Sequence, residues 1–261
     1  MEKTTPVNSP ATVKVSPPSA LDPFAVAARL VAAGKRAGFQ VEPYGEAAGC
    51  PLLALTKRTP GPRPRLYLSA GIHGDEPAPP LALLQMLEAG VFDRRAVWFL
   101  CPLLNPAGFL HSVRENAAGL DLNRDYREPQ SDEIRSHVRW LRRQPNFDLT
   151  LAVHEDWEAK GYYLYEQNPL GRPSLAEPML AAAASACPID PSPLIDGREA
   201  VQGIIRPTGD PLLRDKWPES IYLRAYHTTL AYTTESPSAL ALAVRIAAHR
   251  AALEAALRLS C

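Results

Sequence analysis

Three residues of the sequence have the types and positions of a metal site. His73 and Glu76 stand three apart in the segment HGDE, after an apolar run and before a helical pattern. Side chains three residues apart share a face once a helix begins, so both can reach one point. His154 follows the apolar run at residues 149–153 and can supply a third ligand. Two imidazoles and one carboxylate leave zinc a position open for water.

Each of these residues also has a purely structural interpretation. HxxE can be a helix start with a solvated glutamate, and a histidine at a strand end is often only hydrogen-bonded. Together, the three favour a metal site. Glu235 ends another apolar run, in the segment TTESP. It can be a catalytic carboxylate, or an acid near the N-terminus of the last helix, where the helix dipole favours negative charge.

A polar segment after the apolar run at residues 96–103 can bind an anion. It contains NPAG at 105–108, Arg114, and GLDLNR at 119–124. Arginine and asparagine side chains suit a carboxylate or a developing oxyanion. The alternative is a solvated loop in which Arg114 and Arg124 pair with Glu115 and Asp121.

The order of these motifs resembles the zinc carboxypeptidase family. HGDE, NPAG, RENAAGLDLNRDY, a strand-end histidine and TTESP follow one another from about residue 65 to residue 240. The segment from Arg114 to Tyr126, joined to HxxE, is the most specific part. The resemblance implies a zinc carboxypeptidase-like fold. It also implies that His73, Glu76 and His154 bind one Zn²⁺ per chain.

The resemblance assigns roles around that metal as well. Glu235 would be the general base, and Arg114 would polarise the scissile carbonyl. Asn123 and Arg124 would hold a substrate carboxylate. Larger carboxypeptidases place a tyrosine over the substrate, and the candidates for it in this chain are Tyr222 and Tyr226.

Three functions stay open at this point. The first is cleavage of an amide bond next to a free carboxylate in small peptides, as in murein peptide amidases. The second is deacylation of N-acyl amino acids, as in aspartoacylase and succinylglutamate desuccinylase, which share HxxE, DLNR and the late glutamate. The third is a pseudoenzyme that only binds peptide C-termini, against which the presence of Glu235 speaks. The short chain and Asp75 inside the metal motif favour the first two over a digestive carboxypeptidase.

The elements around these motifs predict one α/β domain at residues 21–261. Apolar runs of strand length alternate with helical patterns, which favours a mixed, mostly parallel twisted sheet flanked by helices. Strands are expected at 39–44, 52–56, 65–70, 96–103, 149–153, 162–165 and 228–233. Helices are expected from residue 22, ending at Gly38, and at 77–87, 131–141, 175–184 and 239–257. The Pro-rich segment 187–218 is expected to be a long connection that lines a site.

Acidic residues follow His154 closely. Glu155, Asp156 and Glu158 cannot all face the metal, because side chains alternate along a strand. One of them can meet a cationic substrate group, or all three can form a solvated loop. The remaining histidines have no matching partners and are expected to be ordinary polar residues: His111, His137, His227 and His249.

Composition excludes several other classes of function. The 28 basic and 28 acidic residues cancel, so no broad positive field is expected to attract nucleic acid or a membrane. Residues 1–20 lack an apolar signal core and are expected to be a disordered tail. The four scattered cysteines are expected to be free thiols, as in a cytoplasmic protein. Partners are expected to be small substrates, and the sequence leaves the oligomeric state open.

Overall fold

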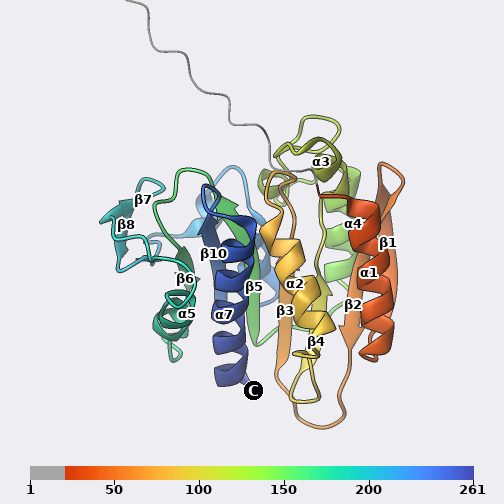
Figure 1. Cartoon of the computed structure of the whole chain (residues 1–261), viewed down its shortest axis with the longest axis horizontal. Coiled ribbons are helices and arrows are strands. Elements are labelled where there is room, and N and C mark those ends of the chain that lie inside the picture. The colour runs from red at the N-terminus through yellow and green to blue at the C-terminus, as the bar shows by residue number, and fades with distance from the viewer. Residues whose placement is uncertain (1–20) are drawn as a thin grey trace, which may run out of the picture.

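A ten-stranded sheet forms the middle layer of the computed structural model, which describes residues 21–261 (Figure 1). The strands are β1 Gln40–Ala47, β2 Cys50–Lys57, β3 Arg65–Ala70, β4 Val97–Cys101, β5 Leu149–Asp156, β6 Tyr163–Gln167, β7 Leu194–Ile195, β8 Arg198–Val201, β9 Ile204–Ile205 and β10 Ala231–Pro237. Their order in the sheet is β1-β2-β4-β3-β5-β10-β6-β9-β8-β7.

Helices cover both faces of this sheet. They are α1 Pro23–Arg36, α2 Ala78–Glu88, α3 Pro106–His111, α4 Asp132–Leu141, α5 Ala176–Ala183, α6 Glu219–Tyr226 and α7 Leu242–Ser260, with short 3₁₀ turns η1 Leu122–Arg124 and η2 Pro211–Leu213. Helices α1, α2, α5 and α7 pack against one another on one face. Helix α4 lies behind the sheet in Figure 1.

Parallel pairing is concentrated at the centre of the sheet. Strands β4, β3, β5 and β10 run parallel to one another. The pairs β1–β2, β2–β4, β10–β6, β7–β8 and β8–β9 are antiparallel. The predicted mixed sheet flanked by helices is confirmed. The parallel majority that we expected holds only for this central part and for the short pair β6–β9.

The alternation of side chains along the central strands builds two cores. On β3, Leu66 and Leu68 face the layer of α1, α2 and α7, whereas Tyr67 faces the layer that includes Trp140 of α4 and Ile221 of α6. A strand buried on both faces must be apolar on both, which explains why β3, β4 and β5 are continuous apolar runs in the sequence.

Local signals in the sequence place the first helix correctly. The Asp22 side chain accepts hydrogen bonds from the backbone N–H groups of Phe24 and Ala25, and Pro23 takes the first helical position. The chain leaves α1 through Gly38 at φ 78°, a conformation that glycine adopts without steric cost. Both were predicted.

The segment 187–218 is more ordered than predicted. It contains β7, β8 and β9, joined by the two-residue turns Asp196-Gly197 and Gln202-Gly203. Both residues of each turn have positive φ, as a type I′ hairpin requires. Strands of two to four residues are too short to show an alternating pattern, which is why the sequence suggested a connection.

Other expectations concern the whole chain. Cys50, Cys101, Cys187 and Cys261 are free thiols, as expected. Within residues 21–261, no helix combines the length and apolar character of a membrane span. The predicted disordered tail, residues 1–20, lies outside the described residues.

Candidate metal centre and active site

Three buried side chains converge at the C-terminal ends of β3 and β5. Nδ1 of His73 lies 2.5 Å from Oε1 of Glu76, and Nδ1 of His154 lies 3.0 Å from Oε2 of the same carboxylate. One donor atom from each residue lies within 4.8 Å of the other two. All three residues are at most 4% exposed. Two imidazole nitrogens and one carboxylate are a donor set that zinc binds, and here they converge on one buried point. The residues therefore fit the metal.

The charges around His73 favour a cation at this point. Burial alone would lower the pKa of His73, but the carboxylates of Glu76 and Asp121 outweigh it and raise the pKa to about 9. Burial raises the pKa of Glu76, and the two histidines reverse this and lower it to about 2. Negative charge is therefore held beside the imidazoles, which also stabilises a divalent cation.

Asp121 orients both His73 and Arg114. Its Oδ1 lies 3.4 Å from Nε2 of His73, and its Oδ2 accepts a hydrogen bond from Nε of Arg114 at 3.0 Å. Metal-binding histidines generally turn their second nitrogen toward a carboxylate, which fixes the ring. Nη1 of Arg114 lies 4.0 Å from Oε1 of Glu76, so the guanidinium stands at the edge of the metal group.

Two glycines let the motif loops approach each other. A Cβ added to Gly74 would overlap the backbone of Gly108, and one added to Gly108 would lie 2.6 Å from Nδ2 of Asn105. Asn105 in turn caps α3, since its Oδ1 accepts a hydrogen bond from the Gly108 N–H at 2.9 Å. The segments HGDE and NPAG therefore interlock, and this contact holds His73 and Glu76 in place.

Glu235 lies beside His154 because of the pairing between β10 and β5. The two residues are partners in this parallel pairing, and Tyr163 is the partner of Glu235 on the other side. Thr233, two residues earlier on β10, shares the face of Glu235. Burial raises the pKa of Glu235 well above the usual value, an effect that the positive charge of His154 opposes. This carboxyl group therefore holds a proton more tightly than an exposed glutamate.

Asn123 and Arg124 stand on η1 at the rim of the same pocket. Oδ1 of Asn123 accepts a hydrogen bond from the backbone N–H of Glu219 at 2.9 Å. This contact occupies the amide oxygen and leaves the amide N–H₂ group to donate to a ligand. Arg124 is exposed, and its Nη1 donates to the Asn123 carbonyl at 2.8 Å.

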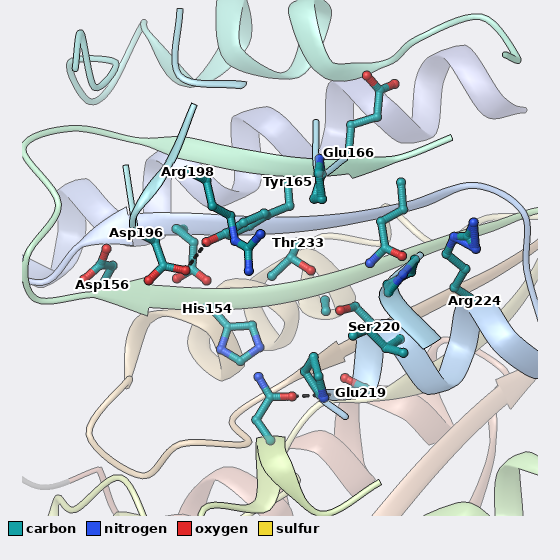
Figure 2. Close-up of a pocket in the computed structure, with 18 of the residues that line it drawn as sticks. His154, Asp156, Tyr165, Glu166, Asp196, Arg198, Glu219, Ser220, Arg224 and Thr233 are labelled. Atoms are coloured by element: carbon teal, nitrogen blue, oxygen red, sulfur yellow. Dashed lines mark hydrogen bonds between the residues drawn. The ribbon is translucent and has the colours of Figure 1, made fainter. Parts of the chain in front are cut away.

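A pocket of about 810 Å³ joins these residues (Figure 2). It is lined by the predicted site residues His73, Glu76, Arg114, Asn123, Arg124, His154 and Glu235. It extends past Thr233 of β10 to side chains of β6, of the β7–β8 hairpin and of α6. Figure 2 shows His154 on one side of the strand that carries Thr233 and Tyr165 on the other.

Known proteins share this fold and part of the sequence. The family model of the succinylglutamate desuccinylase/aspartoacylase catalytic domain matches residues 62–186. A protein of Shewanella amazonensis SB2B with a provisional metallopeptidase assignment is 25% identical, with a TM-score of 0.80 over 90% of this chain and 92% of that chain. No curated protein matches the chain in a sequence comparison.

More distant structures share the fold at lower identity. A metallo-carboxypeptidase from Burkholderia cenocepacia is 22% identical, with a TM-score of 0.67 over 89% of this chain and 67% of that chain. A metallo-carboxypeptidase from Pseudomonas aeruginosa in complex with (2-guanidinoethylmercapto)succinic acid is also 22% identical, with a TM-score of 0.63 over the same shares. The chain therefore has the fold of these metallo-carboxypeptidases, and just under half of it matches the desuccinylase/aspartoacylase model. A metal-dependent hydrolase is the class of function that this supports.

The two predicted tyrosines do not line this pocket. Tyr222 is 3% exposed and packs on Tyr126, whereas Tyr226 is 60% exposed. Neither lines the pocket, but Ser220 and Arg224 of the same helix do. Residues two apart on a helix point about 200° apart, so the face that bears Tyr222 and Tyr226 turns away from the site.

The acids after His154 have three different environments. Glu155 is 5% exposed, pairs with Arg245 of α7 and accepts a hydrogen bond from the Ala78 N–H at 2.6 Å. Asp156 accepts a hydrogen bond from the Tyr163 hydroxyl at 2.9 Å, and Glu158 is exposed. The interpretation of all three as a solvated loop is therefore wrong for Glu155.

Several pocket residues were missed from the sequence. Tyr163, Tyr165 and Gln167 line the pocket from one face of β6, and their spacing of two in YYLYEQ is the signal that could have found them. Further lining residues lie on elements that were not predicted, or on a loop without a recognisable pattern: Trp157, Arg198, Glu219, Ser220 and Arg224.

Proposed function

We propose that the protein is a zinc-dependent hydrolase that cleaves an amide bond next to a free carboxylate in a small peptide. One observation carries the proposal. The β10–β5 register puts Glu235 beside His154, while the histidine is directed at Glu76. A carboxylate that can move protons thus stands next to a group of residues suited to a metal.

The ligands in this proposal are His73, Glu76 and His154, and they hold one zinc ion per chain. When bound, zinc supplies a Lewis acid and lowers the pKa of its coordinated water to about 7. Glu235 then removes a proton from the attacking water and delivers it to the nitrogen of the leaving amine. Its position in the pocket wall, beside His154, suits both steps.

Two arginines neutralise charge on the substrate. Arg114 lies at the edge of the metal group, so it can stabilise the oxyanion that forms when the carbonyl is attacked. Arg124 and the free N–H₂ group of Asn123 face the pocket and bind the substrate carboxylate. Glu219 keeps the Asn123 amide in the required orientation through its backbone N–H.

The first test separates chemistry from metal binding. Glu235→Gln should retain bound zinc and lose activity by roughly 100-fold or more, because the amide cannot accept the proton. Zinc content and kcat/KM on a set of dipeptides measure the two properties. Glu46→Gln, at an exposed position of β1, is the matched control and should behave as the parent does. Near-normal turnover by Glu235→Gln would eliminate the proposed base.

A second candidate is deacylation of N-acyl amino acids. The match of the desuccinylase/aspartoacylase model to residues 62–186 favours it. The chemistry is the same, since an N-acyl amino acid also carries its scissile amide next to a free carboxylate. Zinc-dependent turnover of N-acetyl or N-succinyl amino acids, with no turnover of peptides, would select this candidate.

A further inference from the structure

The three proposed metal ligands come from two separate segments of the chain. His73 and Glu76 lie in the turn between β3 and α2, whereas His154 lies near the end of β5. The backbone pairing of β3 with β5 ends at Ala70 and Val153, before any of the ligands is reached. Sheet pairing alone therefore does not set the position of Glu76 relative to His154.

Helix α2 begins with few backbone donors. Its first residue, Ala78, is preceded by Pro77 and followed by Pro79 and Pro80, and proline has no N–H group. The N–H of Ala78 is therefore the only backbone donor in residues 77–80. Pro77 occupies the capping position and offers this donor no side-chain acceptor. Because Ala78 is fully buried, its N–H needs an acceptor from another part of the chain.

Glu155 supplies that acceptor from β5. Its Oε1 accepts a hydrogen bond from the Ala78 N–H at 2.6 Å. Glu155 directly follows His154, and Ala78 lies two residues after Glu76, so one side chain joins the two ligand segments. Side chains alternate along a strand, so the Glu155 carboxylate lies on the face of β5 opposite to the imidazole of His154.

Arg245 of α7 holds the Glu155 carboxylate in this position. It is 4% exposed, and its Nη1 pairs with Oε2 of Glu155, the oxygen that Ala78 does not use. Helix α7 packs against α2 and contacts β5. Both oxygens of Glu155 are thus engaged inside the protein, so this residue can act on the metal only through the two segments that it joins.

We propose that Glu155 is a positioning residue for the metal centre, which caps α2 from β5 and thereby fixes Glu76 against His154. Arg245 is the counter-ion of this cap, so α7 contributes to metal affinity without contacting the metal. This inference rests on the proposed metal ligands. It depends neither on the identity of the substrate nor on the role of Glu235.

Two double variants that differ by one hydrogen-bond acceptor test the inference. Glu155→Gln with Arg245→Met removes both charges but keeps an amide oxygen for the Ala78 N–H, so it should bind zinc as tightly as the parent does. Glu155→Leu with Arg245→Met also removes the acceptor and should weaken zinc binding by roughly 10- to 100-fold, the usual effect of losing an outer contact that orients a ligand. Competition with a chelator measures these affinities. Both variants should fold, because neither leaves a buried charge without its partner.

Bound cobalt(II) gives a second readout, because its visible absorption depends on the coordination geometry. At saturating cobalt, the glutamine double variant should show the spectrum of the parent, and the leucine double variant should show an altered one. Met179→Ala is the control for stability, since it truncates a buried side chain of α5, an element without proposed ligands. It should lower the free energy of unfolding and leave both the zinc affinity and the cobalt spectrum unchanged.

Two results would overturn the inference. One is equal zinc affinity and equal cobalt spectra in the two double variants. The other is a loss of affinity in Met179→Ala as large as that in the leucine double variant, because instability alone would then explain the effect. Failure of the proposed function gives a different pattern. In that case the parent would bind zinc no more tightly than His73→Ala does, and the inference would fail together with the proposed metal site.

Discussion

Asp121 shows how one side chain can organise several parts of a site. It lies next to Nε2 of His73, accepts a hydrogen bond from Arg114, and caps η1 by accepting one from the Asn123 N–H at 2.9 Å. Burial raises the pKa of Asp121, but His73 and the arginines reverse this and hold the pKa well below the usual value. The carboxylate is therefore charged at neutral pH and positions a metal ligand, an arginine and the turn before Arg124.

This arrangement predicts the effect of neutralising Asp121. Asp121→Asn should weaken zinc binding by roughly 10- to 100-fold, the usual effect of removing a carboxylate behind a ligating histidine. His73→Ala should abolish binding, and Asp132→Asn, an exposed acid in the first turn of α4, should leave it unchanged. Competition with a zinc chelator measures all three affinities. If Asp121→Asn binds zinc as tightly as the parent does, Asp121 has no part in orienting the ligand.

Arg124 leads to a prediction about the substrate. Losing one charge-assisted contact costs about 1.5 to 3 kcal/mol, so Arg124→Ala should lower kcat/KM by roughly 10- to 150-fold. Amidating the carboxylate of the substrate should cost the parent enzyme a similar factor. The two losses should not multiply, since each removes the same contact. Two enzymes assayed on acid and amide forms of one substrate complete the cycle, and independent penalties would exclude Arg124 as the anchor.

At the scale of elements, the strands that carry the site could be predicted and the segments that shape its far side could not. Strands β3, β5 and β10 are apolar runs that end at a polar residue, and this pattern is strong because both faces are buried. Helix α6 has only eight residues and β7 only two, so neither shows a clear period. Tyr222 and Tyr226 are predicted as pocket residues for the same reason. The sequence does not reveal helix α6, so it cannot show which side chains of this segment face the site.

The buried pair behind the metal ligands links three elements. The Glu155 side chain lies on the face of β5 opposite to His154. There it contacts Ala78, the first residue of α2, and pairs with Arg245 of α7. Arg245→Met should lower the free energy of unfolding by about 3–5 kcal/mol, because it leaves a buried carboxylate without its counter-ion.

A matched double variant distinguishes the charge from the packing. Glu155→Gln combined with Arg245→Met removes both charges and should recover a large part of the lost stability. Urea unfolding of the parent, the single and the double variant gives the comparison. A double variant as unstable as Arg245→Met would show that the side-chain volume of Arg245, and not its charge, stabilises this region.

At the scale of the whole molecule, one hydrogen-bond network crosses the protein behind the pocket. The Tyr67 hydroxyl donates its single proton to Glu219 at 2.6 Å. Its oxygen must therefore accept the hydrogen bond from Nε2–H of His137, at 3.0 Å. The Tyr126 hydroxyl then donates to Nδ1 of His137 at 2.8 Å. This network joins β3, α4 and α6 with the loop after η1, and it uses neutral His137 as both donor and acceptor.

The network predicts how stability depends on pH. Burial, assisted by His227, lowers the pKa of His137 to about 3, whereas the unfolded chain has the ordinary value of 6.5. Between these two pKa values the unfolded state binds more protons than the folded state. The contribution of His137 to the free energy of unfolding is therefore complete above pH 6.5 and is lost as the pH falls toward 3. The slope is at most about 1.4 kcal/mol per pH unit for one group. His249, whose pKa burial also lowers to about 3, acts in the same direction.

Urea unfolding between pH 6.5 and 4.5, with a chelator present to remove metal effects, tests this dependence. The parent should lose stability as the pH falls, and His137→Gln should show a smaller slope because one of the buried histidines with a lowered pKa is gone. Equal slopes for parent and variant would mean that His137 does not titrate differently in the folded and unfolded states.

The place of the β7–β9 unit in the sheet bears on how such a protein can diversify. The unit joins the rest of the sheet through two residue pairs with β6, Leu164–Ile204 and Tyr165–Ile205, whereas His154 and Glu235 lie on central strands that pair with neighbours on both sides. The catalytic candidates thus lie at the centre of the sheet, whereas the β7–β9 unit lies at its margin. Because so few residue pairs join this unit to β6, substitutions of its pocket residues Asp196 and Arg198 should change one wall of the pocket without moving the strands that carry the metal ligands.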